Sequence, residues 1–122
     1  MNEDRIEYNI HRLNQLAHSA LAEDNWDCGS SNSICPEVIE KARNILFMTP
    51  PLSCEIEQLI FPSSNNSIQF EYYNSNKDYM EIEVCEDAIF FIERIDGKYG
   101  DEKIISEKEI PDIIRKFYGE EF

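Results

Sequence analysis

The sequence predicts one α+β domain, in which an antiparallel meander of three to five strands packs against three helices as a two-layer sandwich. Two segments with helical spacing of apolar residues precede residue 50, three alternating runs lie between residues 67 and 95, and another helical segment lies near the end. Short polar turns separate the alternating runs, which favours antiparallel pairing because parallel strands need long crossovers. The 122 residues suit a single domain over 1–122.

The first helix is expected over about residues 3–22, where apolar residues recur with helical spacing. A second helix is expected to begin at Pro36, since proline suits the first helical turn, and to end at Thr49 before two prolines.

The third helix is expected near residues 106–118. Ser106 and Glu109 have the spacing of a capping box. Pro111 conflicts with a helix that begins so early, because it would remove one intrahelical hydrogen bond. A start at Pro111, after a preceding turn, therefore stays open.

The strands are expected at residues 67–73, 79–85 and 88–95. Residues 55–61 are either a short strand or an irregular extended piece, and residues 103–105 are a candidate edge strand. Alternation places one set of side chains toward the helices: Ile68, Phe70, Tyr72, Met80, Ile82 and Val84. The opposite face should be wet and carries carboxylates interleaved with tyrosines.

That opposite face supplies the candidate partner-binding residues, which are Glu71, Tyr73, Tyr79, Glu81 and Glu83. Tyrosine provides contact area at interfaces, and carboxylates select a basic partner. The alternative is an ordinary solvated sheet face on which strand-forming tyrosines happen to lie. Residues 55–93 hold nine acidic residues and one basic residue, and this concentration favours docking.

The formal charge of −14 makes some partners improbable. An acidic surface repels the phosphates of nucleic acids and anionic membranes, whereas it attracts a basic protein. No segment has the length of a membrane span or the pattern of a secretory signal, so a cytoplasmic protein is expected. Acidity that serves only solubility remains the alternative.

No motif predicts an enzyme. The chain lacks the nucleophile elbow, the phosphate loop and the zinc-protease signature, and its cysteines, expected to be free thiols, lack zinc-ligand spacing. We therefore expect no catalytic residues, no metal and no cofactor. The competing hypothesis is a small divalent-metal-dependent hydrolase that uses Glu71, Glu81 and Glu83.

A loop between the first two helices contains the only tryptophan, Trp26, followed by Asp27. The simpler interpretation is a core plug, with the aspartate capping loop amides. The functional alternative is a binding hot spot, since tryptophan is enriched at such sites.

Several of these segments together resemble a group of small acidic bacterial proteins. The pattern of that group is N-W-D-G, a helix, a proline-containing turn, I-x-L-E-W and then L-E-I-E-I. Here it corresponds to residues 25–28, the helix from Pro36, and the runs at 67–72 and 79–84. The similarity spans roughly residues 10–95, with Cys28 in place of glycine and Tyr72 in place of tryptophan. It implies a bacterial, non-catalytic, partner-binding protein, and some members of the group are antitoxin-like.

We therefore expect a cytoplasmic protein-interaction module, antitoxin- or inhibitor-like, with a basic bacterial partner and no direct contact with nucleic acid or membrane. A structural subunit that forms homo-oligomers through the tyrosine-bearing face is a third possibility.

Overall fold

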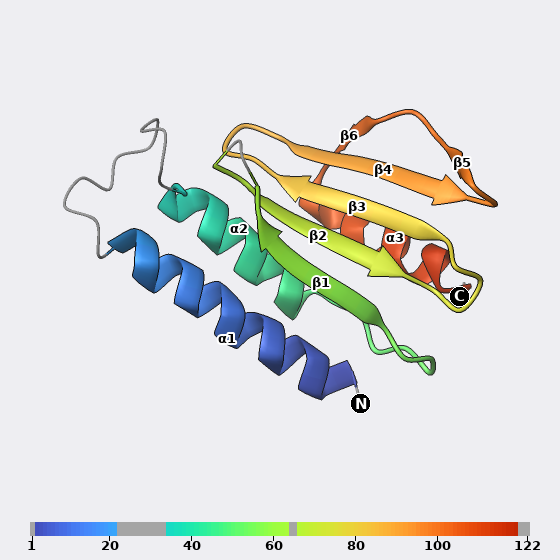
Figure 1. Ribbon diagram of the computed structural model, residues 1–122, viewed down its shortest axis with the longest axis horizontal. Coiled ribbons are helices and arrows are strands. Elements are labelled where there is room, and N and C mark those ends of the chain that lie inside the picture. Colours follow the sequence, from blue (N-terminus) through green and yellow to red (C-terminus); the bar gives the residue numbers. More distant parts are fainter. Residues whose placement is uncertain (1, 22–33, 64–65, 120–122) are drawn as a thin grey trace.

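The computed structural model describes residues 2–21, 34–63 and 66–119, with side chains from residue 3 to residue 16 in the first of these ranges (Figure 1). The helices are α1 (Asn2–Leu21), α2 (Pro36–Phe47) and α3 (Ile110–Phe117), and a 3-10 turn at Glu107–Glu109 precedes α3. The strands are β1 (Glu57–Pro62), β2 (Ile68–Tyr73), β3 (Tyr79–Val84), β4 (Ile89–Ile95), β5 (Lys98–Tyr99) and β6 (Lys103–Ile105). The predicted α+β class is confirmed.

The strands form one antiparallel meander. In the described part of the chain the sheet has six strands, with β1 to β5 in sequence order. Strand β6 pairs with the first half of β4, and β5 pairs with its end. Residues 55–61, for which a short strand and an irregular extended piece were both possible, contain strand β1. The candidate edge strand at residues 103–105 is the short strand β6. The register places Phe70 opposite Ile82 and Glu71 opposite Glu81.

A tight turn at Asp96 and Gly97 joins β4 to β5. Ile95 pairs with Lys98, so the hairpin has a two-residue loop. Both loop residues have positive φ, 52° and 77°. A type I′ turn requires this combination, and an Asp-Gly pair provides it at low cost. An Asp-Gly pair is a local turn signal in the sequence, whereas a strand of two residues is too short for alternation to reveal it.

The inner face of the sheet meets the helices, as the alternation predicts. The six side chains expected on this face are each 0% exposed: Ile68, Phe70, Tyr72, Met80, Ile82 and Val84. They form one core cluster with buried residues of all three helices. In Figure 1, α2 and α3 lie behind the sheet, and no described helix crosses the side that faces the viewer.

Helix α1 runs along β1 and covers that edge of the sheet (Figure 1). Asn9 Nδ2 donates a hydrogen bond to Gln58 O at 3.1 Å, and Arg12 Nε donates to Ile60 O at 2.8 Å. β1 is the terminal strand, so uncovered carbonyls here would be open to pairing with another chain. The helix therefore closes an edge that would otherwise invite aggregation.

A buried polar chain continues inward from the same helix. Asn9 Nδ2 lies 2.9 Å from Gln58 Oε1, and Gln58 Nε2 donates to the Tyr72 hydroxyl oxygen at 2.8 Å. All three side chains are buried. Because buried polar groups are costly without partners, this chain fixes how α1 sits on the sheet.

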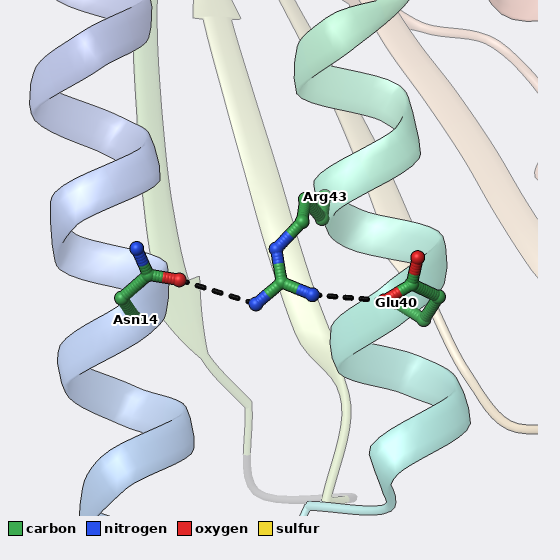
Figure 2. Close-up of polar contacts among 3 residues, drawn as sticks. All are labelled: Asn14, Glu40 and Arg43. Atoms are coloured by element: carbon green, nitrogen blue, oxygen red, sulfur yellow. Dashed lines mark hydrogen bonds and ion pairs between the residues drawn. The ribbon is translucent and has the colours of Figure 1, made fainter.

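Arg43 links α1 and α2 at the surface. Figure 2 shows its guanidinium between two side chains, with Nη2 3.1 Å from Asn14 Oδ1 and Nη1 2.8 Å from Glu40 Oε2. These groups are exposed, so the contacts contribute little stability.

The chain before α3 contains the predicted capping box. Glu109 Oε2 accepts a hydrogen bond from the Ser106 amide at 2.7 Å, and the reciprocal bond is also present. The box closes a 3-10 turn, and α3 begins at Ile110. The later of the two predicted starts is therefore closer to the structure, because Pro111 is compatible only with the first helical turn.

Candidate docking surface

The side of the sheet opposite the helices is called the outer face below. Its side chains on β1 to β4 are Glu57, Leu59, Phe61, Gln69, Glu71, Tyr73, Tyr79, Glu81, Glu83, Phe90, Ile92 and Arg94. The five residues predicted to bind a partner all belong to it, because the register of β2 with β3 brings them together.

Two carboxylates occupy its centre. Glu71 and Glu81 are direct cross-strand partners, a position in which like charges repel. The Tyr79 hydroxyl lies 2.6 Å from Glu81 Oε2 and 3.2 Å from Glu71 Oε2. A phenol has one proton to donate, so the pair shares a single neutral donor at this point.

Further neutral donors surround the pair. Gln69 Nε2 donates to Glu71 Oε2 at 2.9 Å, and the Tyr73 hydroxyl lies 3.4 Å from Glu71 Oε1. Amide and hydroxyl groups orient these carboxylates but do not neutralise their charge.

Glu83 lies next to this pair along β3, and Glu71, Glu81 and Glu83 together are called the acidic centre below. Its Oε2 accepts hydrogen bonds from the hydroxyls of Ser67 at 2.7 Å and Ser63 at 3.2 Å. Both serines belong to the connection between β1 and β2, so this carboxylate also holds that turn against β3. All three acidic side chains of the centre, Glu71 included, are half-buried.

Tyr79 departs from the expectation of a wet face, because it is only 8% exposed. The Arg94 guanidinium lies 5.7 Å from the centre of its ring, and the Tyr73 ring lies 5.3 Å away. Burial, followed by the hydrogen bond and charge of Glu81, raises the pKa of Tyr79, so the phenol stays a donor at neutral pH. Burial and the charge of Glu71 raise the pKa of Tyr73 in the same direction.

Apolar side chains lie on both sides of this acidic centre. Leu59 is the cross-strand neighbour of Glu71, and Ile92 is the neighbour of Glu81. In the next row, Phe61 pairs with Gln69 and Phe90 pairs with Glu83. The outer face is therefore acidic at its centre on β2 and β3 and apolar beside it, at Leu59 and Phe61 on β1 and at Phe90 and Ile92 on β4. The row of Tyr73 and Tyr79 ends instead in Glu57 and Arg94.

The next neighbour of that row lies on β6, where Ile104 pairs with Phe90 and is 72% exposed. The residues of β1, β4 and β6 are not among the site residues predicted from the sequence. The alternation of residues 88–95 does indicate that Phe90, Ile92 and Arg94 share one face of their strand. Their placement beside the glutamates needs the register, which alternation alone does not give.

The acidic centre has no cationic partner in the part of the chain that the structure describes. Arg43 forms an ion pair with Glu40, and Arg115 forms one with Asp112, both on helices. Two arginines lie at the outer face: the Arg94 guanidinium lies over the rings of Tyr79 and Tyr99, and the Arg12 guanidinium of α1 lies 5.9 Å from the ring centre of Phe61. The charge of the acidic centre is thus left to solvent or to a partner.

The three glutamates lie on an open sheet face. None of them lines either of two grooves, of about 930 and 730 Å³, although Tyr73 borders the first groove and Leu59 borders the second. Within residues 3–16, 34–63 and 66–119, no three His, Cys, Asp or Glu side chains are grouped as metal ligands.

The remaining sequence candidates divide into two sets. Trp26, Asp27 and Cys28 lie outside the described residues. Cys85 is a free thiol, and the Sγ atom of the buried Cys35 lies 3.6 Å from Glu86 Oε2. Burial, followed by the charge of Glu83, raises the pKa of Cys85, which makes this thiol a poor nucleophile.

Comparison with protein-family models, with curated proteins and with solved structures gives no match. Among the described helices, none combines the length and apolar character that a bilayer crossing requires.

Proposed function

We propose that this protein is a small cytoplasmic bacterial interaction protein whose outer face docks onto a basic protein, in the manner of an antitoxin or inhibitor. The observation that carries the proposal is the cross-strand pair of Glu71 and Glu81, which only neutral donors contact among the described residues. A basic group from a partner would relieve the repulsion within this pair.

The apolar flanks support the same conclusion. Leu59, Ile92 and Phe90 are half-buried on a sheet face that no described helix covers. Contact with a partner would remove this apolar surface from water and stabilise the complex. A second copy of the chain is a poorer occupant, because it would bring a second acidic centre to the interface.

The proposal is tested by identifying a basic protein that the immobilised chain retains and whose gene lies beside its own. The purified partner is then titrated by calorimetry against the wild type and Glu81→Lys/Glu83→Lys. The reversed charges should abolish binding, because they would repel the basic surface that the wild type attracts.

A matched control reverses two exposed helical carboxylates, Glu40→Lys/Asp112→Lys, and changes the net charge by the same amount. It should bind with an affinity close to that of the wild type. Circular dichroism checks that both variants are folded. Wild-type affinity in Glu81→Lys/Glu83→Lys would place the site elsewhere, and the loop of Trp26 would be examined next.

A further inference from the structure

The geometry at the acidic centre limits which basic side chain fits best. Glu71 and Glu81 lie opposite each other, and the Oε2 atoms of both approach the single hydroxyl of Tyr79. An arginine has five N–H donors in a planar fork and can serve two carboxylates at once. A lysine ammonium is a compact point charge and gains less from two acceptors held side by side.

The chain already shows how this face accommodates a guanidinium. Arg94 lies with its Cζ atom 5.7 Å from the ring centre of Tyr79 and 5.6 Å from that of Tyr99. On β2, Tyr73 offers a second, half-buried ring 5.3 Å from Tyr79, and its hydroxyl points to Glu71. Stacking on such rings favours a planar guanidinium over an ammonium.

The apolar side chains beside the two glutamates indicate which groups of a partner would surround a bound arginine. Leu59 and Ile92 close the row of the two carboxylates at either end, on β1 and β4. The methylene stem of an arginine packs on apolar surface while its head reaches the charge. Neighbouring apolar side chains of the partner would cover the same residues.

We propose that the outer face recognises an arginine of its basic partner, seated between Glu71 and Glu81, with apolar partner residues over Leu59 and Ile92. This inference rests on the proposed docking function and specifies the chemistry of the docked group. The geometry therefore predicts a preference for arginine over lysine at equal charge.

The test uses two blocked pentapeptides, one of alternating leucine and arginine and one with lysine in place of arginine. Each is titrated into the full-length ¹⁵N-labelled chain while amide shifts are followed by NMR. The arginine peptide should shift amides of residues 69–73 and 79–83, and the lysine peptide should bind roughly tenfold more weakly. Both peptides carry the same charge, so the comparison isolates the shape of the cationic group.

Glu71→Gln/Glu81→Gln should remove the preference for arginine, whereas the matched control Glu40→Gln/Asp112→Asn should keep it. Equal dissociation constants for the two peptides at the outer face would overturn the arginine inference and leave the proposed docking function standing. Failure of both peptides to shift the outer face would count against the docking function itself. The comparison on the wild type does not depend on the folding of any variant.

Discussion

Glu71 and Glu81 face each other across β2 and β3 and share one hydroxyl donor, that of Tyr79, at 3.2 and 2.6 Å. The fold thus holds two like charges in adjacent cross-strand positions without a cation from the described residues between them. Such a pair lowers the stability of the free protein. Its retention is understandable if a bound partner offsets the repulsion.

Glu71→Gln should therefore raise the free energy of unfolding by about 0.5 kcal/mol, because it removes the repulsion and keeps an acceptor oxygen. Urea denaturation at neutral pH measures this change, with Glu40→Gln as an exposed control. A loss of stability in Glu71→Gln would mean that the carboxylate serves the fold rather than a partner.

Tyr79→Phe should lower the free energy of unfolding by about 1 kcal/mol, because Glu81 and Glu71 lose their shared donor. Tyr73→Phe is the matched control on the neighbouring strand, and its weaker contact of 3.4 Å should make its effect smaller. Equal losses in the two variants, measured by urea denaturation, would contradict the role assigned to the Tyr79 hydroxyl.

Asn9→Ala should destabilise the protein by about 1–3 kcal/mol, because it leaves the carbonyl and side chain of Gln58 without their buried donor. Asn14 lies on the same helix as Asn9, and Asn14→Ala removes only an exposed contact to Arg43 of α2, so it should change stability by less than about 0.5 kcal/mol. Thermal denaturation compares the two. Similar melting temperatures would show that the buried polar chain does not fix α1 on the sheet.

The alternation of residues 68–73 and 79–84 was enough to predict the meander, its inner face and the five clustered candidate residues. The side chains of Phe70 and Ile82 are apolar, whereas those of Glu71 and Glu83 are charged. Only one orientation of these strands toward the helices therefore buries the apolar side chains. Local signals also predicted the second helix at Pro36 and the capping box at Ser106.

Contacts distant in sequence could not be predicted. Asn9 and Arg12 reach β1 across 48–49 positions, and no local pattern marks either residue as an edge cover. The burial of Tyr79 depends on Arg94 in the next strand, so it follows from the register and not from alternation. The apolar flanks of the site were missed for the same reason.

Stability should fall as the pH rises above about 10. Burial raises the pKa of Tyr72, Tyr79 and Tyr118 in the folded protein, so these phenols keep protons that the unfolded chain releases. Their contribution to the free energy of unfolding is therefore complete below the pKa that tyrosine has in the unfolded chain, and it is lost progressively as the pH rises above that value. Phenolate absorbance at pH 11 should be lower in native protein than in urea-unfolded protein, and equal absorbance would contradict the assignment.

The central claim is that the outer face docks a basic partner by charge, and the association rate constant measured against ionic strength tests it most directly. For the wild type and Glu40→Lys/Asp112→Lys, the rate should fall roughly tenfold or more as salt takes the Debye length well below about 10 Å. Glu81→Lys/Glu83→Lys should associate slowly at every salt concentration. A wild-type rate that is insensitive to salt, or an equal rate in Glu81→Lys/Glu83→Lys, would contradict the claim.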